Sequence, residues 1–281
     1  MKDSIAELSD GRRLAYTDLG DPDGPCTFFF HGGPGSRLYP VYLDDELRRC
    51  GVRIVAPDRP GYGGSSPSPD RRLTAWPGDV AELADALSIR RFGVAGHSSG
   101  GPYAVVTAAS LDDRVAHATI FAGVTDVGWP DAWSGFIETE RHLMRMRTEA
   151  DVVQWCTQHY GADGSRFFDS AGLDFPAPDL PLLEGGPIAD SIQAAVVEAF
   201  RQGVGGYAQD VFVQGQPWAF DPDSIRCPVL VLHGGADPVV PLEHSRHTVG
   251  RIPGAELRVL EGHGHLTIVS LLPDVIGSRV A

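Results

Sequence analysis

The sequence predicts an α/β fold in which a mainly parallel central sheet carries helices on both faces and a helical cap is inserted into the chain. Two observations lead to this prediction. Over roughly the first 120 and the last 60 residues, short apolar runs alternate with amphipathic helical patterns, as in a parallel sheet covered by helices. From about 125 to 220 the pattern is helical, without a convincing strand. A length of 281 residues suits one domain with an insertion.

In the first part of the chain the expected strands end at residues that favour turns. The apolar run at 27–31 stops at Gly32, and the run at 52–56 stops at Pro57. Apolar side chains recur at i, i+3, i+4 and i+7 from Val80 to Leu87, which is the spacing of an amphipathic helix. The expected strands are 12–19, 27–31, 52–56, 92–96 and 115–121, and the expected helices are 75–88 and 100–110.

The end of the chain resumes this alternation after the cap. The expected strands are 228–233 and 256–260, and the expected helices are 242–251 and 266–280. We therefore assign 1–124 and 221–281 to the core and 125–220 to the cap. Inside the cap, helices are expected from Thr148 and around Ile192 to Phe200, and the Gly-, Pro- and Asp-rich stretch 161–187 is expected to be a long loop. Ligands bind at the carboxyl edge of open α/β sheets, so the cap is expected to be a lid over that edge.

The composition excludes several classes of function. With 23 basic and 37 acidic side chains the net charge is −14, which argues against binding to nucleic acid or to an anionic membrane. The only lysine is Lys2, so neither a Schiff-base lysine nor a Gly-Lys-Ser/Thr phosphate loop is available in the body of the chain. No cofactor is expected, and the expected partner is a small-molecule acyl substrate.

Cysteine usage and the N-terminal pattern indicate a cytoplasmic, soluble protein. The four cysteines stand far apart, without a Cys-x-x-Cys pair, and are expected to be free and mostly buried thiols. The first residues contain no apolar segment typical of a signal peptide, and no stretch approaches the roughly 18 apolar residues of a membrane span.

The segment Gly96-His97-Ser98-Ser99-Gly100 matches the pattern Gly-x-Ser-x-Gly between an expected strand and an expected helix. In that context the serine sits on a sharp turn, and a side chain at either outer position would collide with neighbouring backbone. Ser98 is therefore the candidate nucleophile; the alternative is a serine that only begins a helix.

A serine nucleophile needs a base, and the base needs an acid that fixes its tautomer. His265 directly precedes the last expected helix, and we favour it over His263. A metal site at these two histidines is not expected, because no further ligand pattern accompanies them. Asp237 follows the expected strand 228–233 and is the candidate acid, with Asp126 as its rival. All these residues come after strands, so they are expected at one edge of the sheet.

Backbone N–H groups of a glycine-rich segment complete the expected site. The segment His31-Gly32-Gly33-Pro34-Gly35 follows a strand, and we assign the oxyanion donors to the N–H groups of Gly33 and Ser99. His31 is expected to be structural. A phosphate cradle is the alternative for this loop. In the cap, Trp129, Trp133 and Phe136 are candidate pocket residues, although such aromatic residues more often form the interior of a cap.

Taken together, these motifs resemble the α/β-hydrolase superfamily in its serine-nucleophile branch, over everything except the cap. The motifs that carry the resemblance are Asp10-Gly11-Arg12, His31 to Gly35, Asp58-Arg59-Pro60-Gly61-Tyr62-Gly63-Gly64-Ser65-Ser66, Gly96 to Gly100, Asp237 and Gly264-His265. The resemblance implies a cofactor-free hydrolase that works through an acyl-serine intermediate.

Within the superfamily, His31 to Gly35 resembles the proline iminopeptidases, but two other segments depart from them. Those enzymes usually have Asp-Gln-Arg-Gly where this chain has Asp58-Arg59-Pro60-Gly61, and their elbow usually reads Gly-Gly-Ser-Trp-Gly. We therefore expect hydrolysis of carboxylic esters first and aminopeptidase activity second. A third hypothesis, that the chain is a ligand-binding relative without catalytic activity, is the least favoured, because every candidate triad position holds a residue of the required type.

Overall fold

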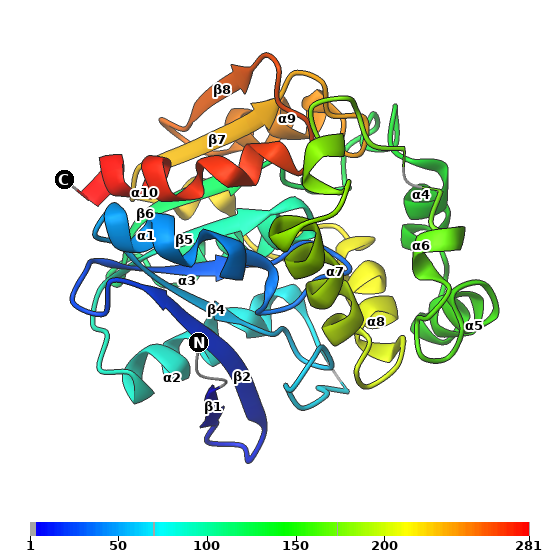
Figure 1. Cartoon of the computed structure of the whole chain (residues 1–281), viewed down its shortest axis with the longest axis horizontal. Helices are drawn as coiled ribbons and strands as arrows, with labels where there is room; N and C mark the ends of the chain where they lie inside the picture. The colour runs from blue at the N-terminus through cyan, green and yellow to red at the C-terminus, as the bar shows by residue number, and fades with distance from the viewer. Residues whose placement is uncertain (1–3, 70, 173, 281) are drawn as a thin grey trace.

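An eight-stranded sheet forms the centre of the computed structural model, which describes residues 4–69, 71–172 and 174–280 (Figure 1). The strand order is β1-β2-β4-β3-β5-β6-β7-β8. Strands β1 and β2 pair antiparallel, as do β2 and β4, and all the other pairs are parallel. The strands are β1 (Ser4–Glu7), β2 (Arg13–Gly20), β3 (Cys26–Phe30), β4 (Arg53–Pro57), β5 (Phe92–His97), β6 (Val115–Phe121), β7 (Val229–Gly234) and β8 (Glu256–Leu260). The mainly parallel sheet predicted from the sequence is confirmed.

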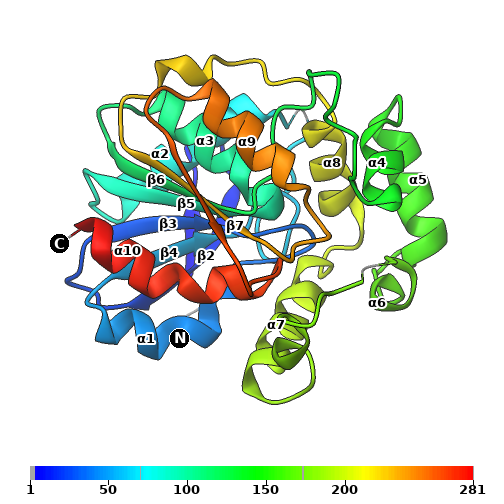
Figure 2. The same cartoon turned by 90° about the horizontal axis from the view of Figure 1, so that it is seen from above.

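Helices cover both faces of the sheet, and Figure 2 shows α1 and α10 on one side and α2, α3 and α9 on the other. These helices are α1 (Asp44–Arg49), α2 (Trp76–Ala86), α3 (Gly101–Ser110), α9 (Leu242–Arg251) and α10 (Leu272–Val280). Successive side chains of β3 point to opposite faces, so Phe28 and Phe30 join the core under α2 and α3, whereas Phe29 joins the core under α1 and α10. Two hydrophobic cores thus fix the sheet from both sides.

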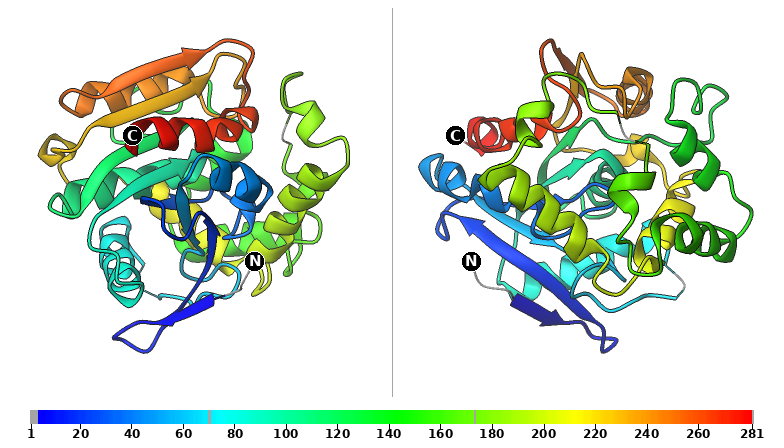
Figure 3. Two further views of the ribbon diagram at one scale, coloured as in Figure 1. Left: turned by 60° about the vertical axis from the view of Figure 1, so that its left-hand side comes forward. Right: turned by 45° about the vertical axis from the view of Figure 1, so that its right-hand side comes forward.

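The segment between β6 and β7 is helical. Its helices are α4 (Glu138–Met144), α5 (Glu149–Tyr160), α6 (Phe167–Ser170), α7 (Pro187–Ala199) and α8 (Gly205–Gln214). They gather at one end of the sheet (Figures 2 and 3) and share a third hydrophobic core, centred on side chains such as Cys156, Tyr160 and Tyr207. We call residues 125–220 the cap segment.

Several expected elements coincide with the structure, and the differences have physical causes. The strand β1 was not expected because only four residues form it, and its pairing with β2 stabilises it as an edge strand. Helix α1 was missed because it buries only Leu47; acidic residues in its first turn and basic residues in its last turn favour it instead. The expected long loop 161–187 contains the short helix α6.

The chain has two further features that bear on its surroundings. All four cysteines are free thiols; Cys26 and Cys156 are buried, Cys227 is half-buried and Cys50 is exposed, so the expectation of mostly buried thiols holds for only part of the set. Among the residues that the structure describes, no helix is both long enough and apolar enough to cross a membrane.

Candidate active site

Ser98 lies on a sharp turn at the carboxyl end of β5, where the chain enters a 3-10 turn (Ser98–Gly100) and then α3. Its φ is +53°, a left-handed conformation that is uncommon for residues other than glycine. A Cβ on Gly96 would lie 2.2 Å from the carbonyl oxygen of Gly100, and a Cβ on Gly100 would lie 2.1 Å from that of Phe30. The turn therefore requires glycine at both positions, as the sequence predicted.

A cavity of about 320 Å³ lies between this turn and the cap segment. Ser98, Ser99, Gly33 and His265 line it from the core. The cap contributes mainly apolar side chains, among them Phe136, Ile137, Met144, Phe167, Ile192 and Val196. Concave apolar surfaces with a few polar groups are typical of small-molecule sites, so this cavity is the candidate substrate pocket.

His265 is held by a carboxylate. Its Nδ1 lies 2.8 Å from Oδ2 of Asp237, and neither side chain is more than 5% exposed. The other carboxylate oxygen, Oδ1, accepts hydrogen bonds from the N–H groups of Val239 (2.8 Å) and Val240 (3.1 Å). Burial alone would raise the pKa of Asp237, but the His265 ring, the nearby His233 ring and the N–H of Val240 together lower it below its ordinary value. An ionised Asp237 keeps the proton of His265 on Nδ1, so Nε2 is available as a proton acceptor.

His97 connects the elbow to the His265 loop. Its Nε2 lies 2.9 Å from the carbonyl oxygen of His265, and the centroids of the two rings are 4.7 Å apart. Burial, reinforced by the neighbouring His265, lowers the pKa of His97 to about 3. His97 is therefore neutral near pH 7, and its Nε2–H donates to that carbonyl. This bond ties the His265 backbone to His97, the residue that precedes Ser98.

Asp126, the alternative to Asp237 as the acid, contacts groups other than His265. Oδ2 of Asp126 lies 3.1 Å from Nη1 of Arg251, and its Oδ1 accepts from the N–H groups of Gly128 and Trp218. Of the two candidate histidines, His265 is the one that lines the cavity. The structure therefore brings Ser98 and His265 to one cavity, with Asp237 behind His265.

Gly33 and Ser99 lie against each other at the cavity wall. A methyl group on Gly33 would come within 2.8 Å of Ser99 Oγ. The two residues meet because they follow β3 and β5, which are adjacent parallel strands with Phe30 opposite Gly96. Ser99 also stands at the N-terminal end of the 3-10 turn and α3, where backbone N–H groups favour negative charge.

The three aromatic candidates of the cap segment differ in whether they line the cavity. Phe136 lines the cavity, but Trp129 and Trp133 do not belong to its described lining. Trp129 instead stacks on His247, with centroids 4.5 Å apart, and Trp133 packs under the guanidinium of Arg145. These contacts agree with the alternative that such aromatic residues form the interior of the cap segment, because aromatic composition does not indicate which face of the cap a ring occupies.

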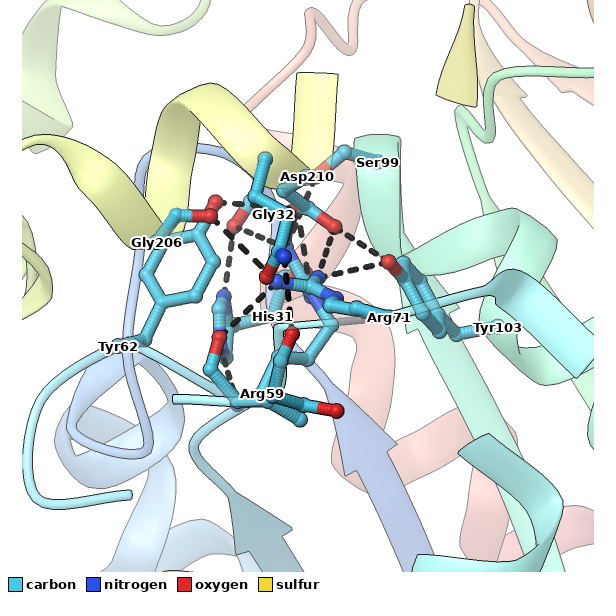
Figure 4. Close-up of polar contacts among 12 residues, drawn as sticks. His31, Gly32, Arg59, Tyr62, Arg71, Ser99, Tyr103, Gly206 and Asp210 are labelled. Carbon is cyan, nitrogen blue, oxygen red and sulfur yellow. Dashed lines mark hydrogen bonds and ion pairs between the residues drawn. The ribbon is translucent and has the colours of Figure 1, made fainter. Parts of the chain in front are cut away.

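The sequence offers Glu140 only as one of several acidic residues of the cap segment, and it does not predict the two polar pairings described next. Glu140 lines it and accepts a hydrogen bond of 2.6 Å from the Tyr207 hydroxyl. Burial raises the pKa of Glu140 to about 7, against the effect of this hydrogen bond. Behind the Gly33 loop, Arg59 and Asp210 form a buried ion pair of 2.7 Å (Figure 4). No local pattern predicts either pairing, since each joins residues far apart in the chain.

Comparison with known proteins identifies the family of the chain. Residues 28–270 match the model of the alpha/beta hydrolase fold family. The chain is 30% identical over 244 residues to the bifunctional esterase/perhydrolase DCH of Acinetobacter calcoaceticus, covering 84% of this chain and 83% of that one. It is 29% identical over 265 residues to the uncharacterized hydrolase YcgS of Bacillus subtilis, covering 92% and 89%.

A solved structure shares the same fold. The esterase EaEST from Exiguobacterium antarcticum superposes with a TM-score of 0.76 at 20% identity, and 99% of each chain is covered. The family match spans most of the chain, including the strands that precede Ser98, Asp237 and His265. The chain belongs to the alpha/beta hydrolase fold family, and it is a hydrolase.

Proposed function

We propose that the chain is a serine hydrolase that cleaves carboxylic esters or related acyl compounds through an acyl-enzyme. In this proposal Ser98 is the nucleophile, His265 the general base and Asp237 the acid that orients it. The observation that carries the proposal is the meeting of Ser98 and His265 at one apolar cavity, with His265 hydrogen-bonded to a buried carboxylate. The order Ser98, Asp237, His265 along the chain also matches that of α/β-hydrolases.

The reaction proceeds in two halves. His265 Nε2 takes the proton of Ser98 as Oγ attacks the acyl carbon, and the resulting oxyanion accepts hydrogen bonds from the N–H groups of Gly33 and Ser99. The tetrahedral intermediate collapses, and the leaving alkoxide takes the proton from His265. Water then attacks the acyl-serine by the same route, so the products are a carboxylic acid and an alcohol.

The cavity walls indicate the kind of ester. Apolar side chains of the cap segment surround the space in front of Ser98, so the substrate carries an apolar acyl or alcohol group. In this proposal residues 125–220 are a lid that excludes water from the reacting carbonyl. The free thiols support a reducing compartment, and we place the enzyme in the cytoplasm.

Aminopeptidase activity is the second candidate, and Glu140 is the observation that favours it. A free α-ammonium group needs a carboxylate partner in the cavity, and Glu140 provides one. Three other carboxylates of the cap segment have different surroundings: Glu138 pairs with Arg141, Glu198 pairs with Arg37, and Glu184 is exposed. A single carboxylate whose pKa is raised to about 7 is a weaker cation site than a pair, so ester hydrolysis ranks first.

A panel of chromogenic substrates separates the two functions. The purified protein and the Ser98→Ala variant are assayed with p-nitrophenyl esters of graded acyl length, prolyl and alanyl arylamides, and the N-acetylated arylamides. We expect the protein to cleave the esters and the Ser98→Ala variant to be inactive on all of them. Cleavage of the free-amine arylamides that is abolished by N-acetylation, with no ester hydrolysis, would overturn the ester proposal in favour of the aminopeptidase.

A further inference from the structure

A buried polar network lies directly behind the loop that carries Gly33 (Figure 4). Its centre is Arg59, which is fully buried and follows β4. The Nη2 atom of Arg59 lies 2.7 Å from Oδ2 of Asp210, a residue of α8 in the cap segment. Asp210 also binds the Arg71 guanidinium and the hydroxyls of Tyr62 and Tyr103.

The guanidinium of Arg59 binds the glycine loop as well as Asp210. It donates to the carbonyl oxygen of His31, to that of Gly32 at 3.3 Å, and to Ser99 Oγ at 3.2 Å. The His31 ring strengthens this arrangement. Its Nε2 accepts from the Arg59 N–H at 3.4 Å, so Nδ1 carries the proton and donates to Gly32 O at 2.7 Å.

The hydrogen bonds to the Gly32 carbonyl also determine the direction of the Gly33 N–H. The Gly32–Gly33 peptide is trans. In a planar trans peptide the C=O and N–H groups point in opposite directions. Because Arg59 and His31 hold the Gly32 carbonyl on their side, the N–H of Gly33 is directed away from them.

We propose that Arg59 is a positioning residue for the oxyanion hole, and that Asp210 of the cap keeps Arg59 in place. The inference rests on the proposed function, because it assumes that Gly33 N–H and Ser99 N–H stabilise the oxyanion. Arg59 contacts the Gly32 carbonyl, which belongs to the same peptide group as the Gly33 N–H, and it also contacts the hydroxyl of Ser99. The cap segment therefore contributes to the chemistry as well as to the walls of the pocket.

One buried carboxylate, that of Asp210, pairs with two buried guanidinium groups, those of Arg59 and Arg71. Burial alone would raise the pKa of Asp210, but Arg59 and Arg71 together lower it to about 2. Asp210 is thus ionised throughout the working range of the enzyme. Removal of one partner of a buried ion pair leaves an uncompensated charge, so conservative variants are the suitable probes.

The test compares turnover with affinity for a tetrahedral intermediate. Arg59→Lys keeps the charge opposite Asp210 but loses the planar fork that reaches two acceptors at once. Its matched control is Arg37→Lys, since Arg37 is another buried core arginine that pairs with a cap carboxylate, Glu198. Each variant is assayed with the p-nitrophenyl ester that the wild type cleaves fastest, and with a trifluoromethyl ketone of the same acyl chain.

For Arg59→Lys we expect kcat to fall about 10- to 100-fold and KM to change less than about threefold, because the oxyanion exists only after the nucleophile attacks. The inhibition constant of the ketone, which forms an oxyanion on Ser98, should rise by the same factor as kcat/KM falls. Arg37→Lys should lower the unfolding temperature while kcat stays within about threefold of the wild-type value.

Ser99→Ala keeps the experiment decisive if Arg59→Lys does not fold. It removes the hydroxyl that Arg59 binds, leaves the Ser99 backbone N–H in place, and creates no buried charge. We expect kcat and ketone affinity to fall together by about three- to tenfold. Wild-type kcat and ketone affinity in both Arg59→Lys and Ser99→Ala, beside an inactive Ser98→Ala, would overturn this inference alone. Full activity of Ser98→Ala would overturn the proposed function, and this inference with it.

Discussion

Asp237 Oδ2 lies 2.8 Å from His265 Nδ1, although the two residues stand 28 positions apart in the chain. They meet because they follow β7 and β8, which are adjacent parallel strands with Gly234 opposite Leu260. The carboxylate is completely buried, and its second oxygen is occupied by two backbone N–H groups. With Oδ1 bound to these N–H groups, Oδ2 is the carboxylate oxygen that faces His265 and orients its ring.

Asp237→Asn is expected to lower kcat for ester hydrolysis on the order of 10⁴-fold, because an amide favours the wrong tautomer of His265. Steady-state kinetics on the best p-nitrophenyl ester measures this effect. Asp126→Asn is the matched control, since Asp126 contacts Arg251 and loop N–H groups instead of His265. A large loss in Asp126→Asn with a small one in Asp237→Asn would assign the acid to the earlier strand.

Gly100→Ala is expected to prevent correct folding or to cost more than about 3 kcal/mol in the free energy of unfolding, because its Cβ would lie 2.1 Å from a backbone oxygen. Gly78→Ala, in α2, has no atom within 4 Å of the added Cβ. That control should be neutral or stabilising by up to about 1 kcal/mol. Chemical denaturation of both variants measures the difference, and equal stabilities would contradict the tight turn.

Glu140→Gln is expected to change how stability depends on pH. Burial raises the pKa of Glu140 to about 7 from an ordinary value of 4.5, so the folded chain binds this proton more tightly than the unfolded chain does. Stability from this group is therefore present below about pH 4.5 and is lost as the pH rises towards 7, by at most about 3 kcal/mol.

A glutamine at position 140 cannot lose a proton, and its carbonyl still accepts the Tyr207 hydrogen bond. The unfolding temperature of Glu140→Gln relative to the wild type should therefore increase between pH 5 and pH 8. A difference that stays constant across this range would show that Glu140 does not titrate in it. Tyr207→Phe, which removes the donor to Glu140, should steepen the loss with pH, because that hydrogen bond lowers the pKa of Glu140.

The core of the fold could be predicted from the sequence because its signals are local. Strands at 115–121 and 256–260 and the helix at 242–251 have the bounds expected from their apolar patterns and turn residues. Ser98, Asp237 and His265 were accessible to prediction for a related reason. Ser98 directly follows β5, Asp237 and His265 lie in the loops after β7 and β8, and parallel strands bring their carboxyl ends to one edge.

The cap side of the cavity could not be predicted, because tertiary packing alone decides which of its residues face Ser98. Phe136 and Trp133 are aromatic residues only three positions apart in the sequence, yet of the two only Phe136 lines the cavity in the described structure. The Arg59–Asp210 pair joins residues 151 positions apart, and neither position carries a local pattern that names its partner. Glu140 likewise becomes a cavity residue only through the packing of α4 against α8.

In the proposed mechanism Ser98 forms the acyl-enzyme, and the turnover of Ser98→Ala on the best p-nitrophenyl ester tests that step. Thermal unfolding first establishes that the variant is folded. The proposed mechanism predicts a loss of at least about 10⁴-fold in kcat, with little additional loss in the Ser98→Ala/His265→Ala double variant, since the triad acts as a unit. Ester hydrolysis by folded Ser98→Ala within tenfold of the wild-type rate would contradict it.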